Sequence, residues 1–139
     1  RPVGSAAQLA EVVARTLGRR RGQRVHPATR TFQALRICVN DELGRLESGL
    51  TAAVQLLASA GRLVIISYHS LEDRLVKNLL IREAAGCICP PGVAICSCEH
   101  EPTIRLVSRR VVRPTAEEVR RNSRSRSAKM RVAESLRAD

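Results

Sequence analysis

GRLVIISYHSLEDR, residues 61–74, predicts a strand that is followed at once by a helix. Leu63–Ile66 is a continuous run of branched apolar residues without alternation, which is typical of a strand buried on both faces. Ser70 and Asp73 have the spacing of a capping box, so the helix should begin directly after the strand and run to about Glu83. A buried strand, a tight turn and a helix form the repeating unit of a doubly wound α/β fold with a parallel sheet.

Apolar residues at helical spacing predict two further helices ahead of this strand. A capping-box pattern that begins at Ser5 indicates a helix over about residues 6–17. Farther along, apolar residues recur every three or four positions, so one long amphipathic helix is expected over about residues 30–59. Cys38 lies on this long helix, where we expect it to be an ordinary buried residue.

The chain beyond Glu83 should be irregular at first and then form short elements. Alternating apolar and basic residues over 104–112 predict a half-exposed strand, and Thr115 has the position of a cap for a short helix. A basic, hydroxyl-rich loop follows at 122–127. Residues 129–133 alternate only weakly, so they fit a strand or a helix.

The net charge of +11 results from 24 Lys and Arg against 13 Asp and Glu among 139 residues. The excess is at the two ends, because residues 1–36 and 102–139 carry +7 each and residues 37–101 carry −3. Clustered basic residues are what phosphate neutralisation requires, so we expect a nucleic-acid or phosphate partner; a solvated surface is the alternative. Phe32 and Tyr68 are the only aromatic residues, which favours contacts to backbone and shape over rows of stacked bases.

Several classes of protein are excluded by the sequence. No apolar run approaches the roughly 18 residues of a membrane span, and no signal-peptide pattern opens the chain. The hydrophobic share of 44% excludes a disordered polyelectrolyte. A Gly-rich phosphate loop, a G-x-S-x-G motif and an H-E-x-x-H motif are all missing, so the residues alone name no reaction. Met130 is the only methionine, and a chain that begins Arg1-Pro2 is therefore interpreted as a fragment or a processed product.

The turn at residues 67–74 is the candidate functional site, because ligands of open α/β sheets bind beyond the carboxyl ends of the strands. His69 can donate or accept a hydrogen bond at neutral pH, and Ser70 with the helix amides behind it can hold a phosphate or a polar base edge. Asp73 can accept a hydrogen bond from an amine, and Arg74 can hold a phosphate. In the alternative interpretation, Ser70 and Asp73 only cap the helix and His69 only ends the strand.

Four cysteines fall within one short loop: Cys87, Cys89, Cys96 and Cys98. Two close pairs of thiolates can surround one tetrahedral zinc ion, which would staple a loop that has no core of its own. The usual zinc knuckle has two residues between the cysteines of each pair, whereas this loop has one. Reduced free thiols and a redox or disulfide role therefore remain alternatives.

Three blocks of the sequence each match a motif of one known family. Residues 26–43 are similar to HPATRxFQALRIxVNDEL, and residues 61–74 are similar to GGRLxxISFHSLEDR, with Tyr68 in place of the usual Phe. Residues 122–134 are similar to NPRSRSAKLRVAE, with Ser and Met in place of Pro and Leu. The chain thus resembles the ribosomal RNA small-subunit methyltransferase H family, over nearly all of its own length but only the C-terminal part of the family, somewhat under half.

The resemblance implies an S-adenosylmethionine-dependent enzyme that methylates the exocyclic N4 amine of a cytidine in 16S ribosomal RNA, in the small ribosomal subunit and in the bacterial cytoplasm. It also implies a Rossmann-like methyltransferase fold with an inserted helical domain. Residues 1–25 would end the insertion, and 26–139 would form the second part of the catalytic domain, with a cysteine-rich loop at 86–101 and a basic tail at 102–139. The family's cofactor loop would precede Arg1, so no residue of this chain is assigned to the cofactor.

With this resemblance, His69, Ser70 and Asp73 become the candidate catalytic residues. The candidate RNA-binding residues are arginines of the matched blocks and of the expected insertion: Arg30, Arg74, Arg124 and Arg126, with Arg19, Arg20 and Arg21 as a peripheral contact. A rival hypothesis is a non-enzymatic, zinc-stapled basic protein that binds ribosomal RNA, which would explain the charge and the cysteines but not the capped turn. Part of a parallel sheet would expose an apolar strand edge, so the chain alone is expected to associate or to be poorly stable.

Overall fold

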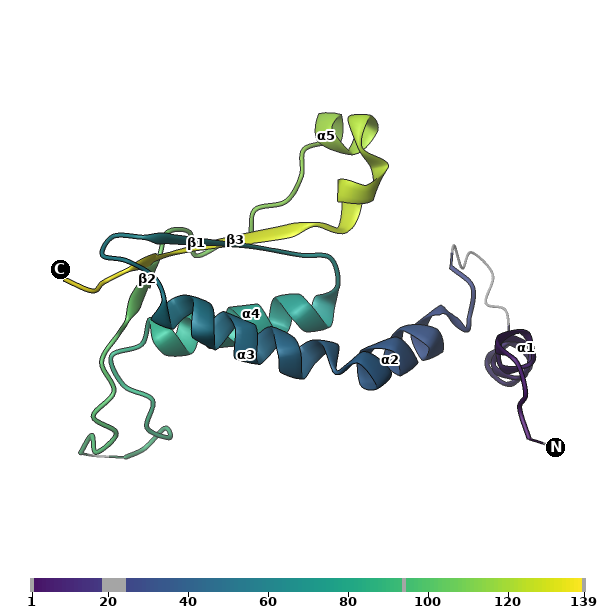
Figure 1. The fold of residues 1–139 in the computed structure, drawn as a ribbon, viewed down its shortest axis with the longest axis horizontal. Coiled ribbons are helices and arrows are strands. Elements are labelled where there is room, and N and C mark those ends of the chain that lie inside the picture. The colour runs from purple at the N-terminus through teal and green to yellow at the C-terminus, as the bar shows by residue number, and fades with distance from the viewer. Residues whose placement is uncertain (1, 19–24, 94, 139) are drawn as a thin grey trace. The chain divides into compact units, whose positions relative to one another are not determined.

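The computed structural model describes residues 2–18, 25–93 and 95–138 (Figure 1). The chain divides into two compact units, Arg1–Glu42 and Leu43–Asp139. The predicted division after residue 25 concerns the domains of a longer fold and stays a prediction. None of the helices among the described residues combines the length and the apolar character that a membrane crossing needs.

The first unit contains helices α1 (Ala6–Leu17) and α2 (Thr29–Asn40). The predicted start of α1 is confirmed, because the hydroxyl of Ser5 accepts a hydrogen bond from the N–H of Gln8 at 3.2 Å. Gly18 ends the helix with a φ of 66°, which glycine adopts without steric cost.

The prediction of one long helix over residues 30–59 is wrong, because the structure divides it at Asp41. Helix α2 ends at Asn40, and α3 (Glu42–Gln55) begins after a single intervening residue. Asp41 has left-handed dihedral angles (φ 49°, ψ 44°), which end a helix and which Asp tolerates better than most residues. Cys38 is exposed rather than buried, since α2 buries none of its residues.

The second unit contains a three-stranded sheet with the order β1-β3-β2 (Figure 1). Strands β1 (Arg62–Ser67) and β2 (Ile104–Leu106) both pair antiparallel with β3 (Lys129–Ser135). The predicted α/β class is confirmed. The predicted parallel pairing is wrong, because every ladder among the described residues is antiparallel. Strands β1 and β2 do run parallel to each other, but β3 lies between them.

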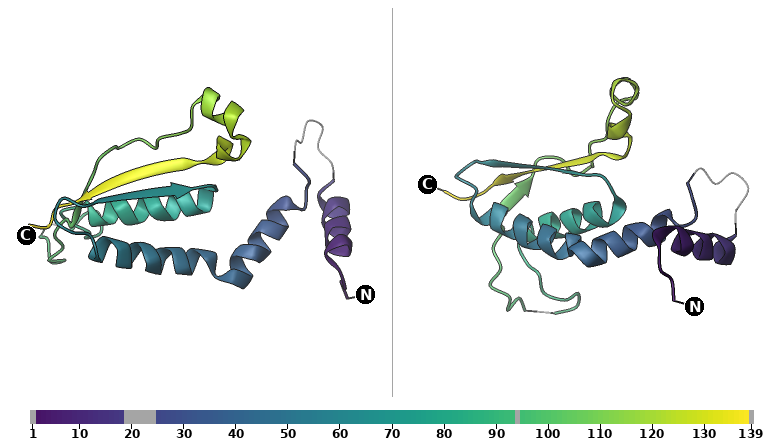
Figure 2. Two further views of the ribbon diagram at one scale, coloured as in Figure 1. Left: turned by 45° about the horizontal axis from the view of Figure 1, so that its top comes forward. Right: turned by 45° about the vertical axis from the view of Figure 1, so that its right-hand side comes forward.

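Helices α3 and α4 (Ser70–Glu83) cover one face of this sheet (Figure 2). The sheet and the two helices share a core made of Leu50, Val54, Val76, Leu80, Ile104 and Ala133. On the other face of β1, Val64 and Ile66 are 53% and 54% exposed. The prediction of a strand buried on both faces is therefore wrong for the described residues, because helices cover only one side.

The chain after α4 forms shorter elements than the sequence predicts. Strand β2 has three residues, and the remainder of the strand expected up to residue 112 is a single bridge between Val112 and Met130. Helix α5 (Ala116–Arg121), capped by Thr115 as predicted, and the 3-10 helix η1 (Ser123–Ser127) follow. The segment that fits a strand or a helix by sequence is part of the central strand, β3.

Replacement of Leu80 by Ala should lower the free energy of unfolding by about 3 kcal/mol, because the truncation leaves a cavity in a packed core. Leu80 is 2% exposed, whereas its neighbour Ile81 on α4 is 48% exposed. Ile81→Ala is therefore the matched control, with an expected loss below about 1 kcal/mol. Urea unfolding followed by circular dichroism measures both changes, and equal losses would contradict the placement of the core.

Candidate functional site

The turn between β1 and α4 is held by a reciprocal capping box. His69, not Ser70 as predicted, is the N-cap of α4: its Nδ1 accepts a hydrogen bond from the N–H of Glu72 at 3.2 Å. In return, Oε2 of Glu72 accepts hydrogen bonds from the N–H groups of Tyr68 at 2.9 Å and of His69 at 3.2 Å. Three backbone N–H groups are thus satisfied locally, which fixes the path of the turn.

The other ring nitrogen of His69, Nε2, is buried and has no hydrogen-bond partner among the described residues. Because Nδ1 accepts a backbone N–H, the neutral imidazole carries its proton on Nε2. Oε1 of Glu72 lies 3.2 Å from Nε2, but the two groups are not aligned for a hydrogen bond. The ring therefore offers an unused donor, a feature that costs about 1–3 kcal/mol when it stays unpaired.

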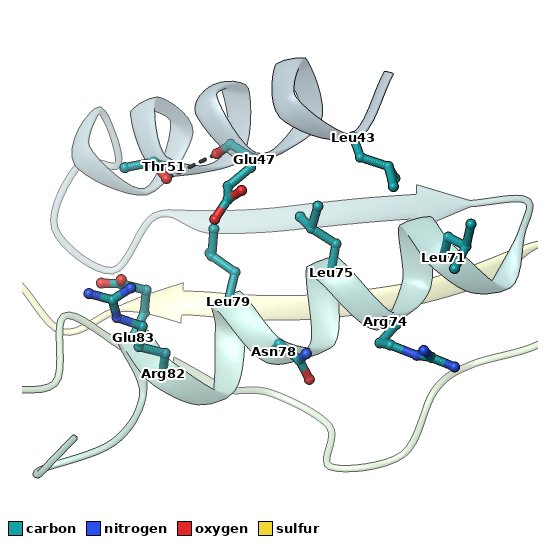
Figure 3. A pocket seen from close by; sticks show the side chains of 10 residues that line it. All are labelled: Leu43, Glu47, Thr51, Leu71, Arg74, Leu75, Asn78, Leu79, Arg82 and Glu83. Carbon is teal, nitrogen blue, oxygen red and sulfur yellow. Dashed lines mark hydrogen bonds between the residues drawn. The ribbon is translucent and has the colours of Figure 1, made fainter. Parts of the chain in front are cut away.

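Ser70 and Arg74 are both exposed at the start of α4. A groove lies between α3 and α4. Figure 3 shows Arg74 and Leu71 at the end of this groove that is nearest to the turn. The groove has a volume of about 500 Å³, and four leucines line it together with six polar or charged residues. Ser70 and Arg74 can thus reach a ligand at the turn without any change in the core.

Asp73 joins α4 to the central strand through two cations. Its Oδ1 accepts a hydrogen bond from Nε of Arg131 at 2.7 Å, and its Oδ2 accepts one from Nζ of Lys129 at 3.4 Å. The hydrogen bond from Arg131 lowers the pKa of Asp73 below its ordinary value of 3.8; burial opposes this change, and Lys129 reinforces it. Asp73 is therefore ionised at neutral pH, and both of its oxygen atoms are engaged by β3.

The basic loop lies at the same end of the sheet as this turn. Ser67, the last residue of β1, is paired with Lys129, the first residue of β3, and η1 leads directly into β3 (Figure 1). Ser125 is buried, and its hydroxyl donates to the carbonyl of Asn122 at 2.8 Å. This contact fixes the loop, and the arginines on either side of Ser125 are exposed.

The structure brings together most of the site residues that the sequence predicts. His69, Ser70, Asp73, Arg74, Arg124 and Arg126 all lie around one end of the sheet in the second unit. Arg30 is exposed on α2 and belongs to the first unit. Arg19, Arg20 and Arg21 lie outside the described residues. The catalytic and RNA-binding roles of all these residues stay predictions.

Two groups of charged residues were missed by the sequence analysis. Lys129 and Arg131, the partners of Asp73, form the first group. In the second group, Glu134 on β3 accepts hydrogen bonds from Arg62 at 2.9 Å and Arg105 at 2.5 Å; the bond from Arg62, followed by that from Arg105, lowers its pKa. Only the strand register reveals the two ion pairs of Glu134, since Arg62 and Arg105 flank it on the neighbouring strands.

The four loop cysteines also meet, because their Sγ atoms all lie within 4.8 Å of one another. The N–H groups of Ile88 and His100 lower the pKa of Cys98 to about 6. The N–H of Cys89 lowers the pKa of Cys87, but its hydrogen bonds with the other three thiols outweigh this effect and raise it to about 12. Two thiols of the same cluster thus have pKa values that are shifted in opposite directions.

Comparison with known proteins gives consistent matches. The model of the MraW methylase family matches residues 1–136. A protein of Thermomicrobium roseum named ribosomal RNA small subunit methyltransferase H is 58% identical over 138 residues, which are 99% of this chain and 42% of that protein. Proteins of the same name from Dehalococcoides mccartyi and Trichlorobacter lovleyi are 58% and 50% identical, over 98% and 97% of this chain and 39% and 44% of their own lengths. The chain thus spans about two fifths of the curated relatives it matches.

Replacement of Asp73 by Asn should lower the free energy of unfolding at pH 7 by about 2 kcal/mol, because it removes an anion that two cations share. The pKa of Asp73 is lowered in the folded chain, so its contribution is present above about pH 4 and is lost as the pH falls through the folded-state value.

Urea unfolding of the unaltered chain and of the Asp73→Asn variant between pH 7 and pH 2.5 measures this dependence of stability on pH. The difference between them should shrink below about pH 4. Asp41→Asn is the control, since Asp41 is exposed and Asn also tolerates its left-handed conformation. A difference that does not change with pH would contradict the ion pairs of Asp73.

Proposed function

This chain belongs to the MraW methylase family, and on that premise we propose that it is part of an S-adenosylmethionine-dependent methyltransferase of small-subunit ribosomal RNA. The supporting observation is identity of up to 58% over nearly the whole chain with proteins named for this activity. We propose further that the target is the N4 amine of a cytidine in 16S ribosomal RNA. The proposed location is the cytoplasm, where the substrate is assembled into ribosomes.

The turn after β1 is proposed to position the target base. A methyl group is transferred efficiently only when the amine is held in line with it, so orientation of the base supplies much of the rate. His69 offers a buried Nε2 donor without a hydrogen-bond partner among the described residues, and Ser70 offers an exposed hydroxyl. The exposed hydroxyl of Ser70 can donate to an acceptor atom of cytosine, O2 or N3, and leave the N4 amine open for reaction; Nε2 of His69 can join it once a shift of the turn exposes the buried ring.

Asp73 is proposed to act as a positioning residue. Its carboxylate is held by Arg131 and Lys129, so it ties the first turn of α4 to the start of β3. The same contacts fix the distance between the His69 turn and the basic loop. A change at Asp73 should therefore alter the alignment of the base without removing a group that touches it.

S-adenosylmethionine supplies the methyl group when it is bound. The sequence contains no Gly-rich loop of the kind that approaches a nucleotide closely, so we assign no residue of this chain to the cofactor. The exposed groups at the turn, the hydroxyl of Ser70 and the guanidinium of Arg74, fit the acceptor atoms of a base and the oxygens of phosphates better than a sulfonium cation, and the carboxylates of Glu72 and Asp73 are already engaged within the chain.

Arg124 and Arg126 are proposed to bind phosphates of the RNA next to the target base. Both are exposed on a loop whose conformation the buried Ser125 fixes, so little ordering is needed when a phosphate binds. Arg74 at the start of α4 can extend this contact, and Arg30 is proposed to make one from the first unit. Because the chain has only two aromatic residues, contacts to the backbone should dominate the affinity.

The sheet is proposed to be one end of a larger Rossmann-like sheet. β1 has no strand partner on its outer edge among the described residues, and its face with Val64 and Ile66 is not covered by a helix. In a longer chain, a further strand would pair with the outer edge of β1, and further helices would cover its exposed face. In that fold, residues 1–25 would end an inserted helical domain and 26–139 would complete the catalytic domain. The rival, a non-enzymatic basic RNA-binding protein, is not favoured by the names of the relatives.

In the full-length protein, His69→Ser should lower the rate of methyl transfer at least about tenfold and leave the free energy of unfolding within about 1 kcal/mol. Serine preserves the capping box with Glu72 but removes the Nε2 donor. Transfer of labelled methyl groups from S-adenosylmethionine to small-subunit particles measures the rate. Lys77→Ala, at an exposed position on α4, is the control and should not change it. An unaltered rate in His69→Ser would remove His69 from the proposed site.

The double variant Arg124→Glu/Arg126→Glu should bind small-subunit ribosomal RNA about tenfold more weakly at low salt, because two phosphate contacts are lost. The slope of log K against log salt concentration should become shallower by about 1.4 for a single-stranded target. Filter binding over a range of salt concentrations measures both. Arg45→Glu/Lys77→Glu makes the same change in charge at exposed positions of α3 and α4 and serves as the control. Equal losses in the two double variants would show a nonspecific effect of charge.

A further inference from the structure

The sulfur atoms of the cysteine loop have the spacing of a tetrahedral metal site. The Sγ atom of Cys96 lies 3.4 Å from that of Cys87, 3.9 Å from that of Cys89 and 3.5 Å from that of Cys98. The Sγ atoms of Cys98 and Cys87 are 3.8 Å apart. Zinc–sulfur bonds of about 2.3 Å in a regular tetrahedron require sulfur atoms about 3.8 Å apart. We propose that Cys87, Cys89, Cys96 and Cys98 together bind one structural zinc ion.

The loop that carries these cysteines has little else to order its outer part. It connects α4 to β2 and extends away from the sheet (Figure 1). Its apolar residues Val93 and Ile95 are 50% and 81% exposed, so they form no core. A loop without a core loses conformational entropy on ordering, and a bound metal ion offsets this loss.

The end of the loop that leads into β2 is tied to the last turn of α4. Nε2 of His100 lies 2.9 Å from the carbonyl oxygen of Arg82, and the hydroxyl of Thr103 donates to Oε2 of Glu83 at 3.0 Å. His100 is thus engaged elsewhere and is not needed as a ligand. The zinc site would order the outer part of the loop, which these contacts with α4 do not reach.

Backbone N–H groups support two of the four sulfur ligands. The N–H of Ile88 donates to Sγ of Cys98, and the N–H of Cys89 donates to Sγ of Cys87, both at 3.4 Å. Such hydrogen bonds orient thiolate ligands and stabilise their charge when a metal is bound. They also let cysteines separated by a single residue turn toward one centre, which explains how the short spacing can serve a site.

The donor set determines the kind of metal and its role. Four soft thiolates in a tetrahedron favour zinc over the hard cations that prefer oxygen ligands. Because the protein fills all four positions, no position remains for an activated water, so the ion holds the loop and takes no part in methyl transfer. The site therefore goes beyond the proposed function and does not depend on it.

The test is the metal content of the full 139-residue chain, purified under reducing conditions without a chelator and without a histidine tag. Mass spectrometry of the elements should find about one zinc ion per chain. Cys89→Ser/Cys98→Ser should reduce the zinc content at least about fivefold, because each substitution removes a ligand. Cys38→Ser is the matched control, since Cys38 is an exposed cysteine outside the cluster, and this variant should keep its zinc.

A second measurement uses the unaltered chain and does not depend on the folding of a variant. Of its five cysteines, only Cys38 should react rapidly with a thiol reagent, and all five should react once a chelator removes the metal. Five reactive thiols without a chelator would overturn the proposal. One reactive thiol in a metal-free chain, with the others released only by a reductant, would show disulfides and also overturn it, as would iron in place of zinc.

Discussion

The insertion of β3 between β1 and β2 is the constraint on which the rest of the second unit depends. Its ladder with β1 pairs residues that are more than sixty positions apart and places the start of β3 beside the end of β1. The basic loop of η1 is therefore carried to the His69 turn, and Asp73 on α4 meets Arg131 and Lys129. At the opposite end, Glu134 joins all three strands through Arg62 and Arg105. Each end of the sheet is thus fixed by one carboxylate that is shared by two cations.

The sequence predicted the elements whose signals are local. Caps and helical periodicity placed α1, α4 and α5 correctly, because these signals depend on residues within one or two turns. The break at Asp41 was missed because the apolar period continues through it. The strand order and the antiparallel pairing were missed for a different reason: the register of β3 depends on partners far away in the chain, and its own alternation is weak. Local patterns cannot specify between which two strands a third strand will be inserted.

The candidate site divides in the same way. The turn was predictable because an apolar run followed by a capping pattern marks the end of a strand and the start of a helix. Its chemistry was not, because Glu72 closes the box with His69 and so displaces Ser70 from the cap. This choice leaves Nε2 of His69 without a hydrogen-bond partner among the described residues, and this nitrogen is a donor that the proposed function uses. Asp73 also links two elements, which the sequence did not reveal, since the cations that bind it come from β3.

Helix α4 separates the His69 turn from the cysteine loop. Its first turn holds the His69 turn and Asp73, and its last turn anchors the cysteine loop through Arg82 and Glu83. At 1.5 Å per residue, its 14 residues hold these ends about 20 Å apart. A metal ion bound by the proposed site at the far end would be too distant to touch a base at the turn, but it would fix the connection to β2, which pairs with β3. The same distance lets the loop vary in sequence without disturbing the turn, because the buried side chains of the helix keep its position on the sheet.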